Sequence, residues 1–473
     1  MSKEWLRTGP DIVIYVPDPD ERPGETNQHF NVVATPAGAF LATWTCGTHE
    51  AHPDQRVVAS RSVDRGRTWS PPETIDGAGP NDPPGTGMAS WQFLIVARPR
   101  FRDFHSAQIP KHRTQDARIW CFYNKNVGID DARAADTGVL RCRFSDDGGV
   151  TWSRETFDYP IEPNAISNPD PDVPPTWIVY QNPTYLPSGH VLAGFTRWAS
   201  NAVDPGVGML ERNSEICFLR FENILTEPDP ARLVVTTWPR CYAARSRRLS
   251  SGAGVSGFEW STAERKSRNM QKSADPGFGI SAPLKSRNTG HGLRVESPFR
   301  PGVSMAQEPT VQPLSDGRLI CVFRTLRGCI YSALSQDDGR TWDKPRPLRY
   351  EPGGEPVLNP CAPCPLYKLS DGRFLLVFYN NDGSGHGGSG PTDAANVRNP
   401  AWITFGHEIP GHPDQPIRFD PPKVFADTNW TPAPGTNRTQ VATYPSLVED
   451  RGEIIIFYPD RKHYLLGKRL SIG

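Results

Sequence analysis

The apolar positions of this chain fall in short runs that are separated by tight turns. Four of these runs, at residues 191–195, 319–323, 374–379 and 454–458, each follow a turn that contains Gly. A strand, a Ser-Gly or Asp-Gly turn and then an apolar strand is the pattern of a β-hairpin. The pattern therefore predicts many short antiparallel strands and no long helix.

Three segments repeat the same turn chemistry, Ser-x-Asp-x-Gly-x-Thr-Trp, at residues 62–69, 145–152 and 335–342. In such a turn the Asp accepts backbone N–H bonds, the Gly supplies a positive φ and the Trp packs beneath the loop. The repeat resembles the Asp-box of sialidase-like β-propellers, in which this turn holds a blade together away from the chemistry. By that resemblance, Asp64, Asp147 and Asp337 are expected to be structural.

A second repeat marks the inner strands of the blades that the resemblance implies. Six blade cores begin near residues 29, 92, 182, 308, 359 and 443, and residues 11–16 form a strand that can close the ring against the last blade. An irregular segment at about 236–301 is either a further blade or a long loop, and a basic loop insertion at about 97–118 interrupts the second blade. We expect an all-β fold, one propeller domain over residues 1–473 with six or seven four-stranded antiparallel blades, seven being favoured.

Composition agrees with this fold and narrows the function. The chain has 49 Pro, 42 Gly and 13 Trp, which suits short strands, tight turns and aromatic surfaces that stack on sugars. Lys plus Arg and Asp plus Glu both number 52, so no global field favours a nucleic acid or a membrane partner. Because the first ten residues contain no apolar run, we expect a cytoplasmic location, or a secreted one if an export signal was removed. A monomer is expected.

The nine cysteines are an odd number spread over a long chain, which favours reduced, buried thiols over a disulfide framework. Cys361 and Cys364 have the Cys-x-x-Cys spacing of a zinc site, but no second such pair accompanies them, so core thiols are expected. The sequence requires no cofactor. A structural calcium or zinc ion stays open, with no ligands that can be chosen.

Candidate functional residues lie at the edges of the inner strands, because these edges converge around the central funnel of a propeller. His29 opens the first inner strand and His49 ends the next strand, twenty residues on, so a hairpin brings both imidazoles toward one end. In the second blade, Tyr123 ends a strand and Arg141 lies on the strand that returns. Further candidates for contact with a substrate are Arg143, Asn182, Arg197, Glu308, Arg324, Asn359 and Tyr444.

His29, His49, Tyr123 and Arg141 have the types of side chain that β-elimination on an uronic acid needs. A cation neutralises the sugar carboxylate, a base removes the adjacent C5 proton and an acid protonates the departing O4. The order and spacing of His29, His49, Tyr123 and Arg141 resemble those of the seven-bladed propeller lyases, namely ulvan lyases and rhamnosyl-glucuronate lyases. The resemblance implies that the two histidines form the catalytic pair, that Tyr123 is the acid or base and that Arg141 neutralises the carboxylate.

The leading hypothesis is thus a lyase that cleaves a 4-linked glucuronate, such as rhamnosyl-α-1,4-glucuronate, within an uronic-acid-containing oligo- or polysaccharide. The basic insertion lengthens the interval between His49 and Tyr123 beyond the lyase pattern, and Arg143 competes with Arg141. One alternative is a hydrolase of the same superfamily, either an α-L-rhamnosidase or a sialidase. For a sialidase, the Arg-Ile-Pro signature is missing, and a three-arginine clamp with a Tyr-Glu nucleophile is not traceable in the sequence. A non-catalytic propeller that binds a glycan or a protein is the other alternative.

Overall fold

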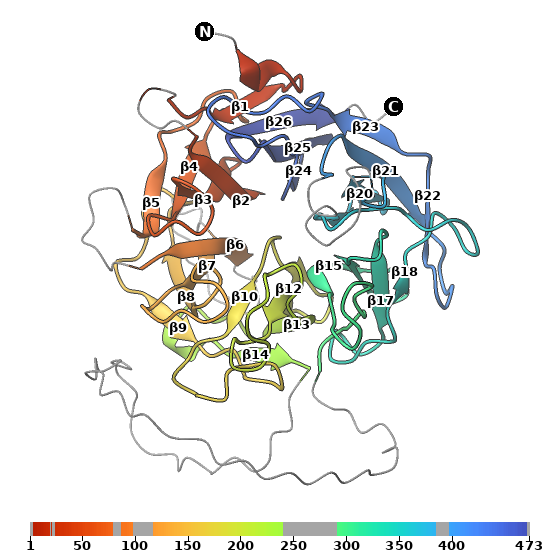
Figure 1. The fold of residues 1–473 in the computed structure, drawn as a ribbon. Coiled ribbons are helices and arrows are strands. Elements are labelled where there is room, and N and C mark those ends of the chain that lie inside the picture. Colours follow the sequence, from red (N-terminus) through yellow and green to blue (C-terminus); the bar gives the residue numbers. More distant parts are fainter. Residues whose placement is uncertain are drawn as a thin grey trace, which may run out of the picture.

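The computed structural model describes residues 3–18, 20, 24–78, 87–97, 117–239, 291–384 and 397–470. Most of the basic insertion and most of the irregular segment that follows residue 236 lie outside these ranges. The described residues form six small antiparallel sheets arranged as blades around a central axis (Figure 1). None of the helices in these ranges is long and apolar enough to cross a membrane.

The blades follow one another in chain order, and the strands of each blade succeed one another from the inside of the ring outward. Blade 1 contains β2 (Thr26–Ala34), β3 (Phe40–Gly47), β4 (Arg56–Ser62) and β5 (Glu73–Gly77). Blade 2 contains β6 (Ala89–Ala97), β7 (Arg118–Lys125), β8 (Val139–Ser145) and β9 (Phe157–Tyr159). Blade 3 contains β10 (Thr176–Ile178), β11 (Thr184–Tyr185), β12 (Val191–Trp198), β13 (Ser214–Phe221) and β14 (Val235–Trp238).

The second half of the ring repeats the arrangement. Blade 4 contains β15 (Gln307–Pro313), β16 (Leu319–Arg324), β17 (Tyr331–Ser335) and β18 (Arg346–Pro347). Blade 5 contains β19 (Leu366–Lys368), β20 (Phe374–Phe378), β21 (Ala401–Glu408), β22 (Ile417–Phe419) and β23 (Lys423–Ala426). Blade 6 contains β24 (Ser446–Asp450), β25 (Glu453–Asp460), β26 (Tyr464–Leu470) and β1 (Ile12–Tyr15). Two short 3₁₀ helices, η1 (Glu4–Leu6) and η2 (Pro230–Arg232), lie outside the sheets.

The ring closes with six blades among the described residues, so the favoured number of seven is wrong. Within each blade the inner strand pairs with the second strand. Blades 3 and 4 are joined directly, since the Glu308 amide donates to Thr196 Oγ1 at 2.7 Å. A seventh blade next to the irregular segment would have to separate these two blades. As residues 11–16 predict, β1 pairs antiparallel with β26, with Ile12 opposite Gly467, so the two ends of the chain share blade 6 (Figure 1).

Each Asp-box lies on the outer turn of its blade and joins that blade to the preceding one. In blade 4, Asp337 accepts from the Thr341 amide at 2.8 Å and from its hydroxyl at 2.6 Å. Trp342 then stacks on Phe218 of blade 3, with ring centroids 4.7 Å apart. Gly339 has a φ of +81°, and a Cβ there would lie 2.7 Å from a methyl carbon of Leu192. The Asp-box is therefore structural, as the sequence predicts.

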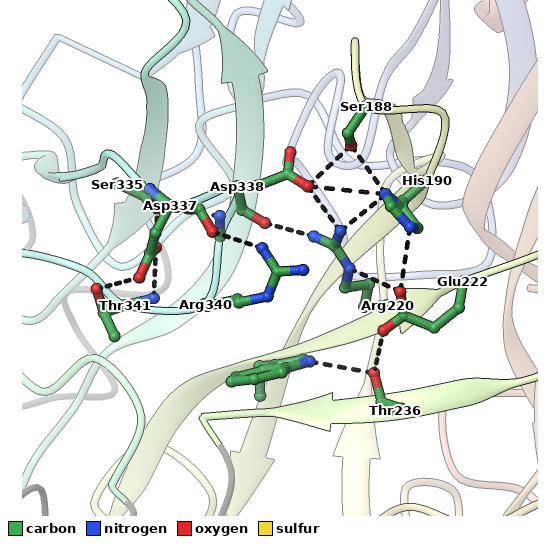
Figure 2. Close-up of polar contacts among 12 residues, drawn as sticks. Ser188, His190, Arg220, Glu222, Thr236, Ser335, Asp337, Asp338, Arg340 and Thr341 are labelled. Carbon is green, nitrogen blue, oxygen red and sulfur yellow. Dashed lines mark hydrogen bonds and ion pairs between the residues drawn. The ribbon is translucent and has the colours of Figure 1, made fainter.

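A second contact between blades 3 and 4 surrounds Arg220, whose side chain is 1% exposed. Its guanidinium donates to Asp338 at 2.6 Å and to Glu222 at 3.0 Å, and His190 lies against the same two carboxylates (Figure 2). Asp338 follows the Asp of the box, so the turn that closes blade 4 also supplies the acceptor for Arg220. These charges hold adjacent sheets together where hydrophobic packing ends.

Candidate functional site

Four blades have the same backbone irregularity close to the start of the inner strand. His29, Trp91, Glu308 and Tyr444 have φ values of +54°, +56°, +52° and +63°. In blades 1, 2 and 4 the pairing with the second strand shifts register at this point, which is the mark of a β-bulge. Left-handed backbone is uncommon for residues other than Gly and persists where the surrounding structure enforces it, often at functional sites. In each of these four blades the irregularity falls on a residue with a large aromatic or charged side chain.

These four side chains meet. The His29 and Trp91 rings are stacked with centroids 3.3 Å apart, and the Tyr444 ring lies 5.4 Å from His29 and 5.7 Å from Trp91. The Tyr444 hydroxyl donates to Glu308 Oε1 at 3.0 Å. Blades 1, 2, 4 and 6 therefore contribute one imidazole, one indole, one carboxylate and one phenol to a single cluster.

Arg324, at the end of β16, completes the cluster through its contact with Glu308. Its Nη1 lies 2.8 Å from Glu308 Oε2, and the two side chains are 6% and 1% exposed. Burial opposes the charged form of Arg324, but Glu308 raises the pKa of this guanidinium above its ordinary value. Burial and the Glu308 charge raise the pKa of the Tyr444 phenol well above its ordinary value. At neutral pH the Tyr444 phenol is therefore neutral, and its hydroxyl donates to the Glu308 carboxyl group.

A layer of charged side chains from blades 6, 1 and 2 lies against His29. Lys462 Nζ donates to Glu50 at 2.7 Å, Arg133 donates to the same carboxylate at 3.2 Å, and Arg133 also pairs with Asp136 at 2.7 Å. Asp136 in turn accepts from the Trp91 indole N–H at 2.7 Å. Burial would raise the pKa of Glu50, but Lys462 and Arg133 hold it well below its ordinary value, so this carboxylate is ionised.

Arg398 is the cation in this region that lacks a carboxylate partner among the described residues. It is 9% exposed, and its Nη2 donates to the Cys361 carbonyl at 2.6 Å. Burial lowers the pKa of the neighbouring Lys462, Arg398 lowers it further, and Glu50 opposes both effects. Two buried cations this close, one without a carboxylate, favour an anionic ligand.

Several buried polar atoms around the cluster have no hydrogen-bond partner among the described residues. They are His29 Nε2, Tyr180 Oη, Tyr379 Oη, Arg398 Nε, and the two ion-paired atoms Glu308 Oε2 and Arg324 Nη1. The Tyr180 ring lies 5.8 Å from the Tyr444 ring. Burial raises the pKa of the Tyr379 phenol, while the nearby Arg398 charge lowers it and the Glu308 charge raises it. Buried polar groups are almost always satisfied, so the unpartnered atoms next to Tyr444 and Arg398 favour a polar ligand there.

Of the four residues that the lyase resemblance assigns to catalysis, Tyr123 and Arg141 are cross-strand partners in blade 2, whereas the two histidines lie apart from them and from each other. His29 lies in the central cluster, whereas His49 is exposed at the rim and its Nδ1 contacts the Glu50 carbonyl at 2.9 Å. Tyr123, on β7, points between blades 1 and 2, where its hydroxyl donates to Asp76 at 2.6 Å. Arg141, on the third strand of its blade, forms a bidentate pair with Asp158 at 2.6 and 2.7 Å.

The seven further candidates divide into two groups. Glu308, Arg324 and Tyr444 meet in the central cluster, as described above. The other four, namely Arg143, Asn182, Arg197 and Asn359, lie elsewhere. Asn182 Oδ1 accepts from the Leu94 amide at 3.0 Å, and Arg197 donates to the Glu162 carbonyl at 2.6 Å. Asn359 Oδ1 accepts from the Tyr379 amide at 2.9 Å, while Arg143 lies on β8, the third strand of blade 2. These contacts join backbone segments.

Sequence reasoning missed Trp91, Glu50, Lys462 and Arg398 as members of the site. Trp91 occupies the same position in blade 2 as His29 does in blade 1, so the inner-strand repeat could have predicted Trp91 as a member of the site. The other three lie in loops, where the repeat gives no register. Cys361 and Cys364 are buried and unpaired, and no group of three metal-binding side chains is found among the described residues.

A cavity of about 860 Å³ lies farther along the inner strands, past the bulges. Its polar side chains are engaged with the backbone: Gln312 donates to the Leu366 carbonyl at 2.8 Å and Lys368 to the Pro313 carbonyl at 2.8 Å. The cavity is therefore distinct from the cluster of unpartnered polar atoms, which is the better candidate for chemistry.

Comparisons with known proteins agree with the fold. The sequence matches the BNR repeat-like domain over residues 254–456 and the BNR/Asp-box repeat over residues 143–154. No curated protein matches the chain in sequence. The chain carries BNR/Asp-box repeats and has the β-propeller fold of the sialidases.

Three solved structures illustrate the structural likeness. The NanB sialidase of Streptococcus pneumoniae has a TM-score of 0.55 at 12% identity, over 98% of this chain and 71% of that one. The intramolecular trans-sialidase of Ruminococcus gnavus has a TM-score of 0.51 at 13% identity, over 94% of both chains. The Hadza microbial sialidase Hz136 has a TM-score of 0.54 at 13% identity, over 94% of this chain and 66% of its own length. Identities this low concern the fold.

Proposed function

We propose that this protein is a glycoside hydrolase that acts on a sugar bearing a carboxylate. The observation that carries the proposal is the buried contact between Tyr444 and Glu308, at 3.0 Å, beside Arg324. A phenol is a weak nucleophile at neutral pH, and an adjacent general base activates it. The structural neighbours include sialidases, and this supports the same class of reaction.

In the proposed reaction, Glu308 takes the proton of the Tyr444 hydroxyl as the phenolate oxygen attacks the anomeric carbon. The bond to the leaving glycoside oxygen breaks, that oxygen takes a proton from solvent water, and a glycosyl-tyrosine intermediate forms. Water then attacks the same carbon and releases one proton to solvent, and Tyr444 leaves with its own proton returned by Glu308. Arg324 Nη1 lies 2.8 Å from the second oxygen of Glu308, so the base is held in place by an ion pair.

The cations define the substrate side of the site. Arg398 and Lys462 supply positive charge next to Tyr444, where a sugar carboxylate forms charge-assisted hydrogen bonds. The sequence lacks Arg-Ile-Pro, and the first inner strand presents His29 at its bulge instead. The carboxylate contact is therefore assigned to blades 5 and 6.

The lyase hypothesis gains no support from the arrangement of its residues. Elimination needs the carboxylate-neutralising cation, the base and the acid around one sugar ring. Tyr123 and Arg141 are engaged with Asp76 and Asp158 on outer strands, away from His29. Hydrolysis at Tyr444 is accordingly better supported than elimination.

The test is the release of a fluorescent aglycone from 4-methylumbelliferyl glycosides of N-acetylneuraminic acid and of glucuronic acid. Tyr444→Phe removes the nucleophilic oxygen and should lower the rate at least about 10²-fold. Tyr458→Phe is the matched control, because the Tyr458 hydroxyl contacts Thr8 at 2.9 Å at the closure of the ring.

Two results would contradict the proposal. Full activity in Tyr444→Phe would exclude the tyrosine nucleophile. An increase in ultraviolet absorbance from an unsaturated uronate, without release of the aglycone, would instead support elimination. Binding of the sugar acids without turnover would favour the non-catalytic propeller.

A further inference from the structure

The protonation of His29 determines what its side of the site can bind. His29 is 1% exposed, its ring is stacked on Trp91, and its Nε2 has no hydrogen-bond partner among the described residues. A neutral imidazole carries one N–H donor and one lone pair, and the two nitrogens exchange these roles between tautomers. The contacts of Nδ1 therefore decide whether Nε2 donates or accepts.

The orientation of the Gln92 amide is fixed by its contact with the backbone of His29. Gln92 Nε2 donates to the backbone carbonyl of His29. A carbonyl only accepts, so the amide nitrogen must face it, and Gln92 Oε1 is turned toward Thr45.

Thr45 then has no proton left for His29. The Thr45 hydroxyl donates to Gln92 Oε1 at 3.0 Å and accepts from the Trp91 backbone N–H at 3.2 Å. A hydroxyl has one proton and two lone pairs, so toward His29 Nδ1, at 3.0 Å, it can only accept. The hydrogen-bond network thus places the proton on Nδ1 and leaves a lone pair on Nε2.

The surrounding charges keep this ring neutral. Burial lowers the pKa of His29 well below its ordinary value; Lys462 and Arg133 lower it further, and Glu50 opposes them. The imidazole therefore stays an acceptor at Nε2 at physiological pH.

We propose that His29 Nε2 accepts a hydrogen bond from a hydroxyl or amide N–H of the bound sugar, and that Thr45 is the positioning residue that fixes this tautomer. This inference rests on the proposed function and deepens it. An imidazole lone pair repels a carboxylate, so the acidic group binds on the side of Arg398 and Lys462. The site then selects a sugar acid that presents a neutral donor group toward blade 1.

The tautomer is measured by two-bond ¹H–¹⁵N correlation NMR on protein labelled with ¹⁵N-histidine, with His29→Gln used to assign the signals. Between pH 6 and 8, Nδ1 of His29 should appear protonated and Nε2 unprotonated. A protonated Nε2 at pH 7 would overturn the inference. Thr45→Val should populate both tautomers, whereas Thr45→Ser, which keeps the hydroxyl, should preserve the parent spectrum.

The acceptor role is tested by adding free N-acetylneuraminic acid or glucuronic acid to the parent protein. The Nε2 resonance should move toward the value of a hydrogen-bonded nitrogen with the sugar whose glycoside is hydrolysed. An unmoved resonance with that sugar at saturation would refute the acceptor role. The tautomer measurement needs no substrate, so failure of the hydrolase proposal would be seen in the aglycone assay alone.

Discussion

Replacing Glu308 with Gln should separate the stability of the site from its chemistry. Removal of one partner of a buried ion pair leaves the other charge uncompensated and costs about 3–5 kcal/mol. Glu308 and Arg324 are such a pair, with side chains 1% and 6% exposed. Because Gln keeps an oxygen that can accept from Tyr444, we expect a loss in the free energy of unfolding of about 3 kcal/mol, the lower end of that range.

That loss translates into a modest shift of the melting temperature. An unfolding entropy of about 2.1 cal/mol/K per residue gives about 1 kcal/mol/K for a chain of 473 residues. Glu308→Gln should therefore lower Tm by about 3 °C. Loss of the general base should lower the rate of aglycone release about 10²–10⁴-fold, much more than partial unfolding can explain.

The double variant Glu308→Gln with Arg324→Met decides whether the two residues act as a pair. A buried ion pair replaced by uncharged groups of similar size is often near neutral in stability. We expect the double variant to recover most of the stability lost by Glu308→Gln, with no recovery of activity, in urea unfolding followed by circular dichroism. A double variant that loses the sum of the two single losses would refute the coupling.

Two further predictions concern the turn and the pH dependence. Gly339→Ala places a Cβ 2.7 Å from Leu192 at a φ of +81°. It should lower the free energy of unfolding, measured by urea unfolding, by about 2–4 kcal/mol. The control Gly317→Ala, at a φ of +89° with open space around it, should lower it by only about 1–2 kcal/mol. The lowered pKa of His29 means that the unfolded chain binds the proton first, so stability falls as pH drops below about 6.5. His29→Gln should flatten the pH dependence of the unfolding free energy between pH 7 and 5, and an unchanged slope would show that the folded imidazole is not protected from protonation.

The fold was predictable because its signals are local. Asp337 bonds to Thr341, four residues on, so the Asp-box chemistry is contained in one octet. The closing strand at residues 11–16 was likewise visible as a short apolar run. The number of blades was harder to predict, because the irregular segment has a length that suits either a loop or a blade.

The site was predictable only in part, since its members meet across long sequence separations. Tyr444 and Glu308 are 136 residues apart, and each was found as the edge of an inner strand without any indication of its partner. Tyr123 misled because successive strand residues face opposite sides of a sheet, and its place at the end of a strand does not show which side it faces. Its side chain faces Asp76 between blades.

The left-handed bulge at the start of the inner strands has a consequence for how such a ring can evolve. The same backbone socket holds an imidazole, an indole, a carboxylate and a phenol in four different blades. In blades 1, 2 and 4 the strand pairing continues on both sides of this residue, so the scaffold there does not depend on which side chain the position carries. A change of specificity therefore requires substitutions at these positions and no rearrangement of strands, and because the four side chains contact one another, neighbouring positions are expected to change together.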